Sequence, residues 1–180
     1  MNDRLLIHGR PFKPYISEEE IRQRVTAIGA DLKKRYEGKR PLMIGILNGA
    51  FVFISDLCRA CDFECEISFT RLSSYVGLES SGEIKTLIGL QKEDIKGRDI
   101  IIVEDIVDTG QTLHQFFQTL DQMEPASVCL VALLVKPEAI QYPFPIDYCA
   151  FEIPNKFVVG YGLDYDGLAR NLASIYQLDE

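Results

Sequence analysis

The chain has 180 residues, and 27 acidic against 19 basic side chains give it a formal net charge of −8. This acidity disfavours nucleic acids and anionic membrane surfaces as partners, because both bind to fields of Lys and Arg. Hydrophobic residues make up 47% of the chain, with no apolar run of the roughly 18 residues that span a membrane, so we expect one folded, cytoplasmic domain over residues 1–180.

The first part of the chain predicts a helix, a strand, a second helix and a second strand. Ser17 and Glu20 have the spacing of a capping box, and apolar residues follow at helical spacing as far as Tyr36. Residues 41–47 predict a buried strand, and residues 50–61 predict the next helix. Residues 63–69 alternate between apolar and polar, which is typical of a half-buried strand with its odd-numbered side chains toward the core.

The segment 73–83 is rich in Ser and Gly and predicts a long mobile loop. Beyond it, strands are predicted at 86–90, 100–103, 127–135, 147–151 and 156–160, with a helix at 110–123. Alternating strands and helices form parallel sheets with right-handed crossovers. The sequence therefore predicts an α/β fold whose mostly parallel central sheet is flanked by helices.

Five cysteines lie at positions 58, 61, 65, 129 and 149. The spacing of the first three resembles half of a zinc site, but no second CxxC and no nearby histidine would complete the coordination. Reduced, partly buried thiols are the interpretation we prefer.

The strand at 100–103 runs into a segment that would bind a phosphate. Ligands of open α/β sheets collect beyond the carboxyl ends of the strands. Gly110 permits a tight turn there, and the N–H groups of the following helix would point at one spot, beside the hydroxyls of Thr109 and Thr112. The alternative is an ordinary turn in which Asp108 only caps the helix.

Glu104 and Asp105 precede this turn and cannot themselves bind a phosphate. Carboxylates accept hydrogen bonds from sugar hydroxyls or help to hold a hydrated magnesium ion. A phosphorylated ribose therefore suits both halves of the segment. The chain has neither a P-loop nor a dinucleotide-binding glycine motif after a strand, which disfavours those two classes.

Residues 101–112 resemble the 5-phosphoribosyl-1-diphosphate signature of the type I phosphoribosyltransferases. Residues 71–75, 134–136 and 151–165 are similar to segments of the hypoxanthine-guanine members of that family, in the same order. The resemblance implies a small hood on the fold, with the long loop and its Ser74 and Tyr75 as a lid. It also implies Mg²⁺-dependent transfer of ribose 5-phosphate to N9 of a 6-oxopurine, in a homodimer or homotetramer.

The resemblance further implies a role for individual residues. Ribose and its 5′-phosphate would be bound by Glu104, Asp105, Asp108, Thr109, Gly110, Gln111 and Thr112. The purine would be bound by Lys136, Phe157 and Val158, the pyrophosphate by Asn48, Gly49 and Arg170, and the metal by Glu104, Asp105 and Asp164.

Two of these residues are implied to act directly on the purine. Asp108 would be the general base that takes the N7 proton, and Lys136 would donate to O6 and so distinguish 6-oxopurines from 6-aminopurines. At the pyrophosphate turn, where a non-proline cis peptide is implied, many relatives carry a basic residue in place of Asn48. A backbone contact is therefore expected there rather than a charge contact.

Two other interpretations stay open. One keeps the fold and the reaction but replaces the base with xanthine or a pyrimidine. The other is a regulatory protein that binds a nucleotide and controls RNA or DNA, which the absence of a Lys/Arg cluster disfavours.

Overall fold

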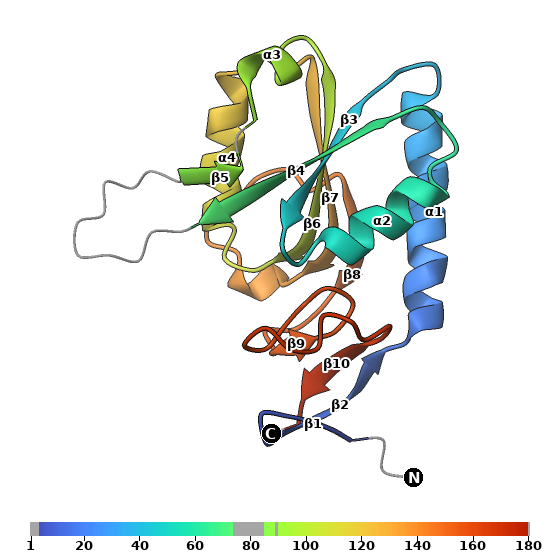
Figure 1. Cartoon of the computed structure of the whole chain (residues 1–180), viewed down its shortest axis with the longest axis vertical. Helices are drawn as coiled ribbons and strands as arrows, with labels where there is room; N and C mark the ends of the chain where they lie inside the picture. Colours follow the sequence, from blue (N-terminus) through green and yellow to red (C-terminus); the bar gives the residue numbers. More distant parts are fainter. Residues whose placement is uncertain (1–3, 74–84, 89, 180) are drawn as a thin grey trace, which may run out of the picture.

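The computed structural model describes residues 4–73, 85–88 and 90–179, and its strands form a large and a small sheet (Figure 1). The large sheet has the order β5-β4-β3-β6-β7-β8, and only the β4–β5 pair is antiparallel. Its strands are β3 (Leu42–Leu47), β4 (Glu66–Ser73), β5 (Lys85–Ile88), β6 (Asp99–Val107), β7 (Ser127–Val135) and β8 (Tyr148–Glu152). The predicted mostly parallel sheet is confirmed.

Helices cover both faces of this sheet. On one face, α1 (Glu18–Tyr36) and α2 (Phe51–Ala60) share an apolar cluster with the odd-numbered residues 101 and 103 of β6. On the other face, α3 (Lys92–Ile95) and α4 (Gln111–Asp121) pack with residues 100 and 102, because successive strand side chains point to opposite faces. The predicted capping box of Ser17 and Glu20 begins α1.

The small sheet joins two stretches that lie far apart in the chain. Its antiparallel strands are ordered β1 (Leu5–Ile7), β2 (Arg10–Ile16), β10 (Ile175–Leu178) and β9 (Val158–Val159). In Figure 1 it lies beyond the carboxyl ends of the parallel strands. This is the small hood that the family resemblance implies.

Strand β6 is longer than predicted. Its pairing with β3 stops at Gly45 and Val103, but its pairing with β7 continues to Val107 and Val135. Glu104 and Asp105 therefore belong to the strand rather than to the turn, and among the described strands only β7 pairs with β6 beyond Val103.

The predicted inward face of the strand at 63–69 is wrong for two residues. Strand β4 begins at Glu66, with Ile67 and Phe69 45% and 37% exposed and Thr70 fully buried. Neither of these two side chains belongs to the apolar cluster beneath α1 and α2.

Two further expectations concern cysteines and membranes. All five cysteines are free thiols, and the described residues contain no group of three metal-binding side chains. No helix in the described part of the chain has both the length and the apolar character needed to cross a membrane.

The contact of α1 with α2 gives the first testable prediction. A Cβ on Gly29 would come within 2.7 Å of the Ala60 carbonyl oxygen. Alanine normally stabilises a helix interior by about 1 kcal/mol over glycine, but overpacking costs about 1–3 kcal/mol. We expect Gly29→Ala to lower the free energy of unfolding in urea, whereas Asp31→Ala on the exposed face of α1 should change it little. A more stable Gly29→Ala protein would contradict the packing.

Candidate active site

The turn between β6 and α4, which we call the cradle, has the geometry of an anion-binding turn. Gly110 precedes α4 with φ of 80°, and an added Cβ would lie 2.6 Å from the Phe144 ring, so this position requires glycine. No side chain of the described residues caps the helix, although the Gln111 backbone nitrogen lies 3.5 Å from Thr109 Oγ1. The first N–H groups of α4 thus face a cavity of about 120 Å³ lined by Glu104 and residues 106–113.

Asp108 does not cap the helix, so the alternative interpretation of this turn is wrong. Gly110 holds the cap position, and Asp108 Oδ2 instead lies 2.8 Å from the Lys136 ammonium nitrogen. The Lys136 side chain is only 9% exposed, and the backbone N–H of Lys136 donates to the Val107 carbonyl. A carboxylate and an ammonium group therefore lie side by side just beyond the ends of β6 and β7.

Residues 140–144 support the cradle from outside, and no sequence pattern predicted this role. The N–H groups of Gln141 and Tyr142 lie 3.0 and 3.3 Å from the Thr109 carbonyl oxygen. The Phe144 ring and the Tyr142 carbonyl lie against Gly110. Nothing in the local pattern of this Pro-containing segment signals such contacts, because they depend on the tertiary fold.

Glu104 and Asp105 are held in an environment that resists charge. Burial raises the pKa of Glu104 well above its usual range, and the neighbouring Asp105 raises it further. Burial also raises the pKa of Asp105 to about 6, against the lowering effects of the Ile106 N–H and the Arg170 charge. Glu104 Oε2 is enclosed without a hydrogen-bond partner among the described residues.

The turn after β3 packs directly onto Asp105. The bond between Leu47 and Asn48 is a cis peptide, in the turn where the resemblance implies one. A Cβ on Gly49 would lie 1.5 Å from Asp105 Oδ2, so only glycine lets the carboxylate come this close. The predicted pyrophosphate turn and the predicted ribose-binding acid are therefore in contact.

Arg170 lies near enough to Asp105 for its charge to lower the pKa of that carboxyl. Its Nη1 donates to the Gly162 carbonyl at 2.7 Å, and its Nη2 pairs with Asp164 Oδ1 at 2.7 Å. Asp164 Oδ2 accepts from the Gly167 N–H at 2.7 Å. Gly162 in turn lies against the Gly49 carbonyl oxygen, which a Cβ would approach to 2.0 Å.

These acids suit a magnesium ion without forming a protein cage for it. Magnesium takes one or two carboxylates and completes its shell with water and substrate phosphates. Glu104 and Asp105 offer this, because an enclosed oxygen without a partner and two raised pKa values mark negative charge that a cation would stabilise. Both carboxylate oxygens of Asp164 already have a partner, Arg170 and the Gly167 N–H, so a metal would compete with them for this carboxylate.

Comparison with known proteins identifies the family. The family model described as phosphoribosyl transferase domain matches residues 16–166. The chain belongs to the phosphoribosyltransferase family. This confirms the resemblance, the fold class and the transferase class that the sequence analysis gave.

Individual relatives agree with this assignment. The chain is 46% identical to the hypoxanthine-guanine phosphoribosyltransferase of Lactococcus lactis, over 89% of this chain and 87% of the relative. It is 39% identical to the hypoxanthine phosphoribosyltransferase of Salmonella typhimurium, with 92% and 96% covered. A crystal structure of a hypoxanthine phosphoribosyltransferase from Staphylococcus aureus superposes with a TM-score of 0.87 at 39% identity, with 93% and 91% covered. The chain is also 41% identical to part of the bifunctional protein TilS/HprT of Listeria innocua, over 94% of this chain and 26% of the length of that protein.

The small sheet of this phosphoribosyltransferase carries the two remaining purine candidates. The Phe157 ring is 44% exposed and meets the Tyr165 ring edge-on at a centroid distance of 5.5 Å. Phe157 also accepts a backbone hydrogen bond from Leu178. Because hydrogen-bonded pairs alternate along an antiparallel ladder, Val158 directs its N–H and C=O away from β10, to the free edge of the sheet.

The structure thus brings most of the candidates into three groups. Residues 108–112 and Lys136 form the cradle, residues 48–49, 105, 164 and 170 form a second group, and Phe157 and Val158 lie on the small sheet. The lid residues Ser74 and Tyr75 lie outside the described residues. Two contacts were not predicted from the sequence, that of Gly49 with Asp105 and that of Gly162 with Gly49. The only sequence signal for them was the presence of glycine at positions 49 and 162.

The raised pKa of Asp105 gives a pH-dependent prediction. A carboxyl whose pKa is about 6 when folded and about 4 when unfolded stabilises the fold below pH 4, and this stability is lost as the pH rises through 6. Asn keeps the acceptor for the Ile106 N–H without this loss. We expect the stability of Asp105→Asn relative to wild type to increase by about 1–2 kcal/mol from pH 4.5 to 7.5, measured by urea unfolding with EDTA. An unchanged difference would contradict the burial of this charge.

Proposed function

We propose that this chain transfers the 5-phosphoribosyl group from 5-phosphoribosyl-1-diphosphate to N9 of a 6-oxopurine, hypoxanthine or guanine. The bond from N9 to C1′ forms as the bond from C1′ to the diphosphate breaks, and the diphosphate leaves with the electron pair. The proton on N7 passes to the protein. The products are IMP or GMP and pyrophosphate.

The observation that carries this proposal is the pair of Lys136 and Asp108. A cationic donor and an anionic acceptor lie 2.8 Å apart, with the lysine held in place by burial. A 6-oxopurine presents an acceptor at O6 next to a donor at N7–H, which is the complementary pattern. A 6-aminopurine would instead direct an N–H donor at the lysine, so the pair discriminates against it.

In this proposal Asp108 is the general base. Its side chain is 47% exposed and therefore accessible to a ligand from the cavity side. As N9 attacks C1′, positive charge develops on the purine, and the Asp108 carboxylate accepts the N7 proton. Phe157 stacks on the base through its exposed ring, and the free backbone groups of Val158 bond the base edge.

The phosphoribosyl donor is bound by the other two groups of residues. The N–H groups and hydroxyls of residues 108–112 take the 5′-phosphate, and Glu104 and Asp105 accept from the ribose hydroxyls. The backbone of Asn48 and Gly49, with the Arg170 guanidinium, takes the diphosphate. Glu104 and Asp105, with Asp164 when it is released from Arg170, hold Mg²⁺, which when bound neutralises charge on the diphosphate and improves it as a leaving group.

We further propose that residues 1–180 act as one domain, in a cytoplasmic homodimer or homotetramer. The small sheet supports the single domain, because β10 pairs with β2 from the start of the chain and with β9. Exposed Phe51, Ile67 and Phe69 support self-association, since exposed apolar side chains commonly mark subunit contacts. The five free thiols agree with a reducing compartment.

A panel of bases tests the reaction. We expect pyrophosphate release with 5-phosphoribosyl-1-diphosphate, Mg²⁺ and hypoxanthine or guanine, and none with adenine or uracil. Xanthine, included in the same panel, ranks the 6-oxopurines. A lack of pyrophosphate release with all three 6-oxopurines would reject the proposed function, and turnover of adenine would reject the role of Lys136.

Asp108→Asn tests the general base. The amide cannot take the N7 proton, so kcat should fall by about 10²–10³-fold while KM for the phosphoribosyl donor changes by less than about threefold. Asp121→Asn at the far end of α4 is the matched control and should leave both constants unchanged. A large rise in KM for the donor with an unchanged kcat would contradict the assignment.

A further inference from the structure

The segment from Gly160 to Leu172 is folded tightly on itself and rests on the turn at residues 48–49. The N–H of Gly162 donates to the Arg170 carbonyl at 2.9 Å, and the Arg170 guanidinium donates back to the Gly162 carbonyl at 2.7 Å. Gly162 is so close to Gly49 that a Cβ would lie 2.0 Å from the Gly49 oxygen. A shift of Gly162 would therefore change the position of Arg170 and the contact with the turn at residues 48–49.

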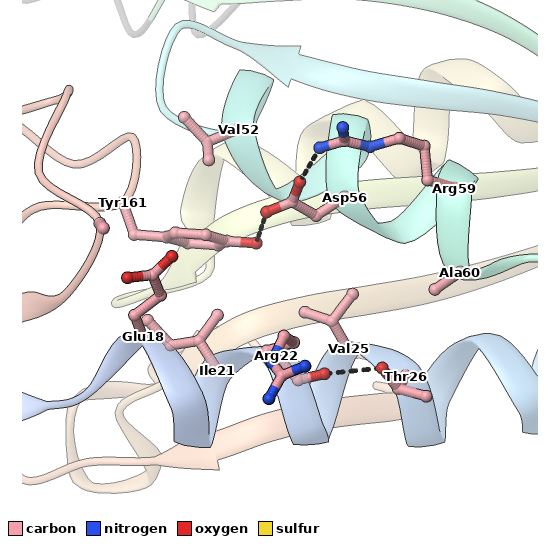
Figure 2. Close-up of a pocket in the computed structure, with 11 residues that line it drawn as sticks. Glu18, Ile21, Arg22, Val25, Thr26, Val52, Asp56, Arg59, Ala60 and Tyr161 are labelled. Atoms are coloured by element: carbon pink, nitrogen blue, oxygen red, sulfur yellow. Dashed lines mark hydrogen bonds and ion pairs between the residues drawn. The ribbon is translucent and has the colours of Figure 1, made fainter.

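The Tyr161 side chain ties this segment to α2. Its hydroxyl donates to Asp56 Oδ2 at 2.6 Å, while Asp56 Oδ1 pairs with Arg59 on the same helix. Figure 2 shows Tyr161 reaching from the loop toward Asp56 and Arg59 on α2. Because α2 starts two residues after Gly49, both ends of this bond belong to parts that border the proposed diphosphate site.

The backbone of Tyr161 needs such a tie. Its φ is 49°, between glycines at 97° and 102°, and a tyrosine in the left-handed region is held there by its surroundings at a cost in energy. The side chain is 5% exposed, and it lines a cavity of about 460 Å³ between α1 and α2 (Figure 2). Tyr161 packs in the apolar cluster beneath α1 and α2, and its hydroxyl bond to Asp56 fixes the end of the side chain against α2.

We infer that Tyr161 and Asp56 are positioning residues for diphosphate binding. Their hydrogen bond holds Gly162 against Gly49 and thereby sets where the Arg170 guanidinium stands relative to the turn. Neither side chain touches the substrate. This inference rests on the proposed function, since it assigns Arg170 and residues 48–49 to the diphosphate.

A purely structural bond would have a different signature from a positioning bond. Loss of a structural bond lowers the melting temperature and the active fraction, and so lowers the apparent kcat for all substrates alike. Loss of a positioning bond raises KM for the phosphoribosyl donor and weakens pyrophosphate binding, while KM for the base stays constant.

Tyr161→Phe is the principal test, because it removes the hydroxyl and keeps the ring. We expect KM for the donor and Kd for magnesium pyrophosphate to rise about tenfold, with kcat and KM for hypoxanthine within about twofold of wild type. Tyr36→Phe is the matched control, since the buried Tyr36 hydroxyl at the end of α1 has no hydrogen-bond partner among the described residues. It should leave all four constants unchanged.

Variants at Asp56 complete a double-mutant cycle. Asp56→Ala should match Tyr161→Phe, and the double variant should be no worse than either single variant, because all three lose the same bond. Asp56→Asn keeps an acceptor for the hydroxyl and should recover part of the affinity. If Asp56→Ala does not fold, Tyr161→Phe carries the test, and Asp56→Asn should lie between it and wild type in donor KM.

An unchanged KM for the donor in Tyr161→Phe would overturn the inference. Equal losses in every constant that follow the melting temperature, or additive effects in the cycle, would overturn it as well. Calorimetric binding of magnesium pyrophosphate separates this failure from failure of the proposed function. A wild-type protein that binds pyrophosphate more tightly than Tyr161→Phe upholds the positioning role even where the panel of bases rejects the transfer reaction.

Discussion

The two carboxylates at the end of β6 are the constraint around which the rest of the site is arranged. β6 continues beyond its pairing with β3, so among the described strands only β7 flanks Glu104 and Asp105, and burial raises the pKa of both carboxyls. Burial disfavours their charge, and that cost falls when sugar hydroxyls or a cation bind. The glycine at position 49, the approach of the 160–172 segment and the Arg170 charge all act on this one spot.

A chain of net charge −8 binds a strongly anionic donor in our proposal. Attraction is local rather than global: the uncapped start of α4, the Arg170 guanidinium and the buried Lys136 ammonium supply positive potential within the site. Much of the remaining acid lies in exposed ion pairs, such as that of Glu124 with Lys92 and Lys96, which add little to stability and are screened by salt.

Local sequence patterns predicted the three longer helices α1, α2 and α4, most strands of the large sheet and the tight turn at Gly110, but not α3 or β10. The capping box at Ser17 and the β-branched run before Glu104 depend on neighbours in the chain, so they were readable. The end of β6, the outward turn of Ile67 and Phe69, and the support from residues 140–144 depend on which strand or helix lies alongside. The same holds for the partner of Asp108. The local pattern allowed Asp108 to cap α4, but its carboxylate instead pairs with Lys136, 28 positions away in the chain.

The order of strands in the small sheet has a consequence for synthesis of the protein. β9, which carries the free edge for the proposed base, is joined to β2 only through β10, and β10 follows every other described element in the chain. Every strand of the large sheet and the turn at 108–112 precede β9 in the chain, but β9 gains its partner in the small sheet only when β10 has been synthesised. The proposed base site therefore depends on a strand that is made after all the other residues of the proposed active site.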